Sequence, residues 1–142
     1  MNKKQSNNLF IVAGAAGEIG SAFCKQFSER QNDVIAVIRN KTIDIKSEFV
    51  TSIRCDLTDS RSIEEAFANI NFSKYQRVTF VHTIGTDKYD PCGYKTIKKM
   101  KTIDTDVYDT NVNTFKYPLR YLINTVRDIE KKEDKKIKLR IV

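Results

Sequence analysis

Short apolar runs alternate along the chain with longer segments in which apolar residues recur every three or four positions. The short runs predict strands at residues 9–13, 34–38, 50–54 and 78–82. The second of these runs is almost uninterrupted, which is typical of a strand covered on both faces of a sheet. A fifth strand is expected at residues 138–142, with Leu139 as an alternative start. Strands that alternate with helices in this way predict an α/β fold with a parallel sheet.

Helical periodicity fills the segments between the predicted strands. Ile19, Phe23 and Phe27 predict an apolar stripe on a helix that follows the first strand. Thr58, Asp59 and Ser60 supply side chains that cap a second helix, whose apolar positions are Ile63, Phe67 and Ile70. The elements therefore alternate in the order that parallel strand pairing requires.

A longer third helix is expected over residues 105–128, where Pro118 should kink the helix or shift its start. Residues 1–8 are predicted to form a flexible tail. Residues 9–142 are predicted to form a single domain, because the chain contains no internal repeat, low-complexity tract or interdomain linker.

Three of the five glycines, Gly14, Gly17 and Gly20, stand where the first predicted strand gives way to a helix. A strand, a glycine turn and a helix in this order are typical of the corner that binds the pyrophosphate of a dinucleotide. The N–H groups and the dipole of the helix N-terminus favour an anion there. Alternatively, the glycines serve packing alone. The residues predicted to contact the cofactor in this turn are Gly14, Ala16, Gly17, Glu18, Ile19 and Gly20.

The spacing Gly-x-x-Gly-x-x-Gly and three later segments resemble the short-chain dehydrogenase/reductase family, and the spacing is closer to its extended and atypical branches. The later segments, in the family's order, are Asp56 to Asp59, Val81 to Gly85 and Asn111 to Thr114. The resemblance covers nearly the whole chain from Leu9 onward. It implies a Rossmann-type, doubly wound parallel sheet with strand order 3-2-1-4-5, in which the C-terminal strands of the family are missing. The ligand crevice would lie at the carboxyl ends of strands one and four.

The resemblance also implies a nicotinamide cofactor and residues that contact it. At the end of the second strand, where NAD-binding relatives carry an acidic residue, this chain has Ile38 followed by Arg39 and Asn40. Because a guanidinium can bind a ribose 2′-phosphate, NADP(H) is favoured over NAD(H). Asp56 and Leu57 resemble the residues that contact the adenine, or else they stabilise a strand-to-helix turn. Gly85 resembles the residue that approaches the cofactor ribose.

Asn111 resembles the helical asparagine of the family's catalytic tetrad, which implies an indirect role in a proton relay through a bound water. Asn113 is the competing assignment. His82 is the only histidine, and we expect a hydrogen-bonded, structural role for it at a strand end. The pair Tyr94 and Lys98 has the spacing of the family's catalytic Tyr-x-x-x-Lys but precedes Asn111, so we interpret it as a chance match.

The family's catalytic Ser and Tyr-x-x-x-Lys would follow the fifth strand, beyond Val142. We therefore expect a truncated chain that is inactive alone: the NADP(H)-binding portion of an oxidoreductase that reduces a carbonyl or oxidises an alcohol. A non-catalytic nucleotide sensor or scaffold protein is the alternative. The resemblance also implies a homo-oligomer formed through the helix at residues 105–128.

Composition adds little to this interpretation. The formal net charge is +7, but much of the excess lies in a lysine-rich cluster at residues 131–140 with interleaved acids, which we interpret as a solvated loop rather than a nucleic-acid site. The three cysteines lack metal-ligand spacing, so no metal site is predicted, and reduced thiols indicate the cytoplasm. No segment predicts a membrane span.

Overall fold

A computed structural model of the chain describes residues 6–84 and 105–142, and only the backbone at residues 105–108, 110 and 111. Five parallel strands form one sheet in the order β3-β2-β1-β4-β5. The strands are β1 (Asn8–Ala13), β2 (Asp33–Ile38), β3 (Val50–Arg54), β4 (Arg77–His82) and β5 (Lys138–Ile141). The predicted fold class and strand order are confirmed.

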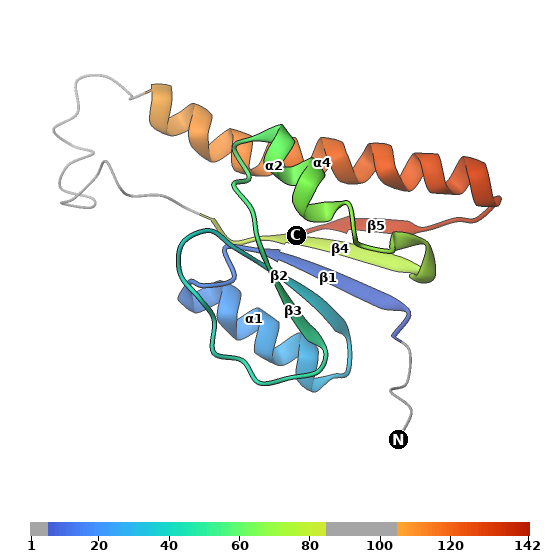
Figure 1. Cartoon of the computed structure of the whole chain (residues 1–142), viewed down its shortest axis with the longest axis horizontal. Coiled ribbons are helices and arrows are strands. Elements are labelled where there is room, and N and C mark those ends of the chain that lie inside the picture. The colour runs from blue at the N-terminus through green and yellow to red at the C-terminus, as the bar shows by residue number, and fades with distance from the viewer. Residues whose placement is uncertain (1–5, 85–104) are drawn as a thin grey trace, which may run out of the picture.

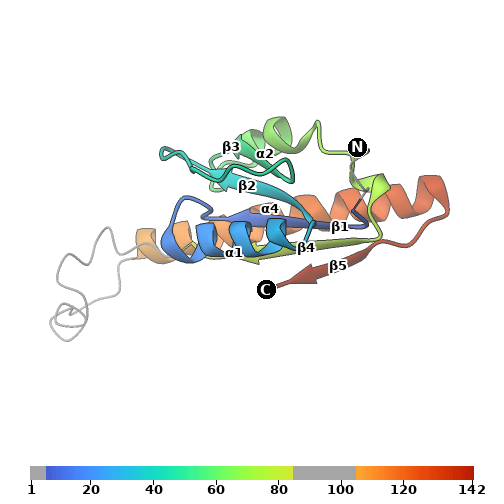
Figure 2. The same cartoon turned by 90° about the horizontal axis from the view of Figure 1, so that it is seen from below.

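Helices cover both faces of the sheet (Figures 1 and 2). Helix α1 (Glu18–Glu29) lies on one face, and α2 (Ser60–Phe67) and α4 (Thr105–Glu133) lie on the other; a 3-10 turn, η1 (Phe72–Lys74), precedes β4. Alternate residues of β1 serve the two faces. Leu9 and Ile11 belong to the core beneath α2 and α4, whereas Val12 belongs to the core beneath α1.

The buried line of α1 differs from the predicted apolar stripe. Gly20, Cys24 and Ser28 are the buried residues of the helix, while Ile19 is 65% exposed. Small residues face the sheet because the helix backbone approaches it closely. Phe23 and Phe27 pack along the flank of the helix, where the Phe27 ring stacks on Phe10 with 3.9 Å between centroids. The prediction was therefore wrong for Ile19 and only partly right for the two phenylalanines.

Helix α4 is longer than predicted and contains Pro118 in its interior. The predicted shift of the helix start to this proline does not occur. The Pro118 ring is fully buried, as is Leu122 one turn later, and this burial offsets the cost of the hydrogen bond that proline cannot donate. Lys131 and Lys132 form part of the last helical turn, where the helix dipole favours cations. The solvated loop predicted over the lysine cluster is thus wrong at these two residues.

Both ends of the described chain refine the predicted boundaries. Ser6 is buried and its hydroxyl donates to the carbonyl of Asn8 at 2.9 Å, and β1 begins at Asn8, one residue before the predicted strand. At the other end, β5 begins at Lys138 and pairs only with β4 among the described strands. Lys138 and Arg140 are exposed while Leu139 packs on the core. Their alternation is that of an edge strand. Over the residues that the structure describes, no helix is long and apolar enough to cross a membrane.

Candidate functional site

The glycine turn joins the carboxyl end of β1 to the start of α1. Gly14 has φ +79°, the left-handed region that favours glycine, and its carbonyl accepts from the N–H of Gly17 at 3.1 Å. Gly17 itself has φ −81° and is the N-cap of α1. The left-handed position is therefore Gly14, and no left-handed geometry opposes a side chain at Gly17.

The three glycines differ in the space around them. A Cβ at Gly20 would lie 2.1 Å from the Gly14 carbonyl oxygen, so Gly20 is required for the close approach of α1 to the turn. A Cβ at Gly14 would lie 2.8 Å from the hydroxyl of Thr83. A Cβ at Gly17 would have its nearest neighbour at 3.4 Å. The structure thus uses Gly14 and Gly20 for the turn and leaves open space at Gly17.

The N-terminus of α1 faces this open space without a side-chain cap. Gly17 has no side chain to accept from the first-turn amides, and among the described residues no other side chain caps them. Glu18 and Ile19 are both exposed in the first turn. N–H groups in this position, at the positive end of a helix dipole, form a binding site for an anion. The geometry of the turn therefore fits the pyrophosphate that the sequence predicts.

Thr83, which the sequence analysis did not select, closes the turn from the side of β4. Its hydroxyl donates to the carbonyl of Ala13 at 2.7 Å, and its N–H donates to the same carbonyl at 3.1 Å. Ala13 pairs with His82 in the sheet, so Thr83 lies beside Gly14. The signal was available in the segment Val81 to Gly85, where a hydroxyl residue directly follows the strand.

A second polar region lies where β2 and β3 end. Ile38 is buried, and Arg39 and Asn40 are exposed directly after it. Arg54, at the end of β3, donates from Nη1 to the carbonyl of Arg39 at 3.0 Å. The structure thus places a second guanidinium, absent from our sequence predictions, beside the arginine expected to select the cofactor.

Asp56 stabilises the turn from β3 into α2. Its Oδ1 accepts from the N–H of Thr58 at 3.0 Å and from the Thr58 hydroxyl at 2.6 Å. The hydroxyl bond is the main reason that the pKa of Asp56 lies below its usual range, and the charge of Arg39 lowers the pKa further. Leu57 is only 4% exposed and packs in the core. Asp56 thus stabilises this turn, and its carboxylate is held ionised beside Arg39.

His82 ends β4 and contacts α4. One ring nitrogen, Nε2, lies 3.0 Å from the Thr114 hydroxyl, and the ring meets Phe115 edge-on. Partial burial lowers the pKa of His82, so the imidazole is neutral at physiological pH. The expected hydrogen-bonded role is observed.

Several predicted site residues lie wholly or partly outside the part of the chain that the structure describes. Gly85, Tyr94 and Lys98 lie outside the described residues, and the side chain of Asn111 does too, although its backbone belongs to α4. Asn113 is partly exposed on the same helix. No group of three or more potential metal ligands occurs within residues 6–84 and 105–142.

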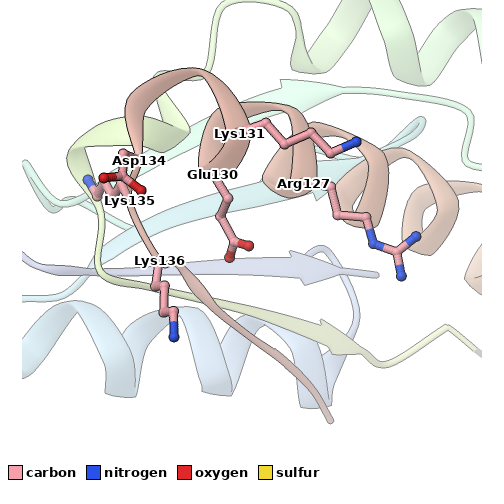
Figure 3. Close-up of a pocket in the computed structure, with 6 residues that line it drawn as sticks. All are labelled: Arg127, Glu130, Lys131, Asp134, Lys135 and Lys136. Carbon is pink, nitrogen blue, oxygen red and sulfur yellow. The ribbon is translucent and has the colours of Figure 1, made fainter.

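A hollow of about 590 Å³ at the C-terminal end of α4 is lined by four cationic side chains, but these do not form an anion site (Figure 3). The Arg127 and Lys131 side chains point away from Lys136 rather than toward a common centre. Glu130 lies among them and accepts the N–H of Ile137 at 3.1 Å, while Lys135 donates to the Ser73 carbonyl. The cations are thus dispersed or engaged, in contrast to the open glycine turn.

The sheet order and the helices on both faces define a Rossmann-type α/β fold. Residues 10–75 match the sequence model of the NAD dependent epimerase/dehydratase family. A search of curated protein sequences gave no significant match. The resemblance to short-chain dehydrogenase/reductases is confirmed by this match together with the solved structures that share the fold.

Three solved structures illustrate the likeness. A short-chain dehydrogenase/reductase from Burkholderia vietnamiensis has a TM-score of 0.63 and 17% identity, with 85% of this chain and 56% of that chain covered. A short chain dehydrogenase from Leptospira borgpetersenii with bound NAD+ has a TM-score of 0.61 and 20% identity, covering 90% and 48%. A serine dehydrogenase complexed with NADP+ has a TM-score of 0.57 and 19% identity, covering 84% and 50%. The chain therefore spans about half the length of these structures, and at these identities the likeness establishes the fold.

Proposed function

We propose that the carboxyl edge of the sheet binds a nicotinamide dinucleotide, and that the chain is the cofactor-binding portion of an oxidoreductase related to short-chain dehydrogenases. The observation that carries this proposal is the glycine turn: an uncapped helix N-terminus faces open space at Gly17, beside the junction of β1 and β4. In open parallel sheets, ligands bind where the strand order reverses. The family match and the nucleotide-bound neighbours support the same conclusion.

Each part of the dinucleotide has candidate contacts. The N–H groups of residues 18–20 would bind the pyrophosphate. Arg39 and Asn40 would contact the adenosine ribose, and the Asp56–Leu57 turn the adenine. When bound, the nicotinamide supplies the hydride that reduces a carbonyl or accepts the hydride from an alcohol. Asn111 stays the proposed relay residue, and Gly85 the residue proposed to approach the cofactor ribose.

We propose NADP(H) as the preferred cofactor. Ile38 presents no carboxylate that would repel a 2′-phosphate, and the next residue, Arg39, is exposed. Within the described residues its guanidinium forms no ion pair, so it is available to an anionic ligand. A charge-assisted, bidentate bond from arginine to phosphate is stronger than a neutral hydrogen bond.

Oligomerisation and location form part of the same proposal. Val112 is 37% exposed on α4, and a hollow of about 350 Å³ beside Phe115, Leu119 and Ile123 extends this apolar surface. This surface supports a homo-oligomer formed through α4. Cys24 and Cys55 are free and buried, which agrees with a reducing compartment such as the cytoplasm.

Calorimetric titration with NADPH and NADH tests the proposal. NADPH should bind more tightly than NADH, and Arg39→Ala should remove the difference at a cost of about 1.5–3 kcal/mol for NADPH. Gly17→Val should abolish binding of both nucleotides, because a branched side chain would fill the open space at the helix N-terminus. Failure of the wild-type chain to bind either nucleotide, or unchanged binding by a folded Gly17→Val variant, would contradict the proposed site.

A further inference from the structure

Two arginines, Arg39 and Arg54, meet at one corner of the sheet. The strands β2 and β3 are parallel, and Ile38 is the register partner of Arg54. The N–H of Cys55 donates to the Ile38 carbonyl at 3.0 Å, which continues the pairing past the end of β3. Arg54 and Arg39 are therefore held side by side at the carboxyl edge, although 15 positions separate them in the chain.

The Arg54 guanidinium is oriented but not neutralised. Its Nη1 donates to the Arg39 carbonyl at 3.0 Å, which uses one of its several N–H donors. Neither Arg54 nor Arg39 forms an ion pair with any carboxylate of residues 6–84 and 105–142. The nearby carboxylate, Asp56, is directed to Thr58 by two hydrogen bonds. Two exposed arginines thus meet at one corner with no ion pair among the described residues, although Asp56 lies near enough to Arg39 for its charge to lower the Asp56 pKa.

Resting on the proposed function, we infer that Arg54 is a second ligand of the 2′-phosphate of NADP(H) and determines cofactor preference together with Arg39. A phosphate monoester offers several acceptor oxygens, which two guanidinium groups can bind at once. The bond to the Arg39 carbonyl limits the conformations of the Arg54 side chain before the ligand arrives, so less conformational entropy is lost on binding. Under this inference both arginines bind the 2′-phosphate and set the cofactor preference, rather than Arg39 alone.

The test compares Arg54→Ala, Arg39→Ala, the double variant and Arg54→Lys in the full chain. Arg30→Ala is the matched control, because Arg30 is an exposed arginine at the C-terminal end of α1, remote from the corner. NADPH, NADH, 2′,5′-ADP and inorganic phosphate are titrated into each protein. Arg54→Ala should weaken NADPH and 2′,5′-ADP about 10- to 100-fold and NADH less than about twofold. Arg54→Lys should recover part of the loss, since it restores the charge without the planar fork.

The outcomes separate this inference from the proposed function. If Arg39→Ala removes the NADPH preference while Arg54→Ala leaves NADPH binding unchanged, the inference is wrong and the proposed function stands. Equal loss of NADPH and NADH in Arg54→Ala also overturns the inference, because Arg54 would then act on the shared adenosine or on the fold. Equal affinities of the wild-type chain for the two nucleotides would contradict this inference and the proposed NADP(H) preference, while the proposed dinucleotide binding would stand.

Discussion

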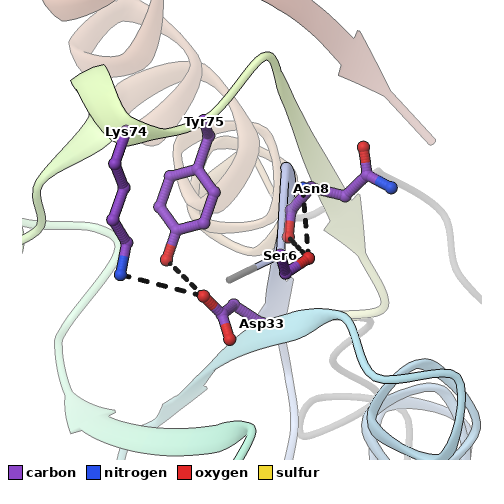
Figure 4. Close-up of polar contacts among 5 residues, drawn as sticks. All are labelled: Ser6, Asn8, Asp33, Lys74 and Tyr75. Carbon is purple, nitrogen blue, oxygen red and sulfur yellow. Dashed lines mark hydrogen bonds and ion pairs between the residues drawn. The ribbon is translucent and has the colours of Figure 1, made fainter. Parts of the chain in front are cut away.

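The two edges of the sheet carry polar groups of opposite character. At the amino edge, the Tyr75 hydroxyl donates to Asp33 at 2.8 Å, and Lys74 lies 3.8 Å from the same carboxylate oxygen (Figure 4). Both Tyr75 and Asp33 are buried, and burial together with the bond to Asp33 raises the pKa of Tyr75. At the carboxyl edge, the first amides of α1 have no side-chain cap and Arg39 is exposed.

This difference separates two kinds of polar group. The buried groups at the amino edge stabilise the fold, and the exposed groups at the carboxyl edge are available to bind a ligand. Buried groups that hydrogen-bond one another, as Tyr75 and Asp33 do, recover in the fold much of what they lose on leaving water. Exposed donors gathered at one edge, with cations beside them, gain most when an anion binds. The polar groups of the amino edge thus serve stability, and those of the carboxyl edge are the groups to which we attribute the proposed dinucleotide binding.

The largest effect on stability is expected at Gly20. Alanine there would bring Cβ to 2.1 Å from the Gly14 carbonyl oxygen, so α1 must move away from the turn. We expect Gly20→Ala to lower the free energy of unfolding by about 3 kcal/mol or more. The matched control is Gly17→Ala, which should change it by less than about 1 kcal/mol because the space is open. Urea denaturation measures both, and equal stability of the two variants would contradict the described geometry.

An intermediate effect is expected at the amino edge. Tyr75→Phe removes the buried hydroxyl that Asp33 accepts from, which should cost about 1.5–3 kcal/mol of unfolding free energy. The affinity for NADPH should not change, since the carboxyl edge is untouched. Tyr117→Phe is the control, because within the described chain the Tyr117 hydroxyl forms no hydrogen bond. If Tyr75→Phe stays folded but loses nucleotide affinity, the amino edge serves more than stability, and the separation of roles between the two edges is contradicted.

The smallest effect on stability is expected at His82, through the pH dependence of unfolding. Burial lowers its pKa in the folded protein, so the unfolded chain binds a proton first as the pH falls. The folded state should therefore lose stability as the pH drops through about 6.5 toward the lowered pKa, and His82→Gln should make this pH dependence shallower. Because the chain has a single histidine, an NMR titration of the imidazole reports its pKa directly. A pKa above the ordinary histidine value would contradict the burial argument.

The fold could be predicted from the sequence because strand periodicity, glycine spacing and family resemblance agree. The strand at residues 50–54 matches β3 at both ends, and Asp59 caps α2 as expected by accepting from the Arg61 N–H at 3.0 Å. It was harder to predict which residues of a helix face the sheet. Ile19 satisfies an apolar period yet is exposed, because small residues occupy the helix face that touches the sheet.

The site was predictable only where it depends on neighbours in sequence. The glycine turn and Arg39 lie within short, local patterns. Thr83 and Arg54 act through contacts with Ala13 and Arg39, which are distant in the chain and become neighbours only through strand register. A single sequence marks Thr83 only as a hydroxyl residue that follows a strand, and it carries no direct signal for the partner of either residue.

The most direct measurement is an amide NMR titration of the full chain with NADPH. The account predicts that chemical-shift changes concentrate at residues 14–20, at Arg39 and Arg54, and at the Asp56 turn, while the amides of Asp33 and Tyr75 stay unchanged. Saturable shifts confined to the carboxyl edge would support dinucleotide binding there. Shifts centred on the amino edge or on residues 127–136, or no saturable shifts at all, would contradict it.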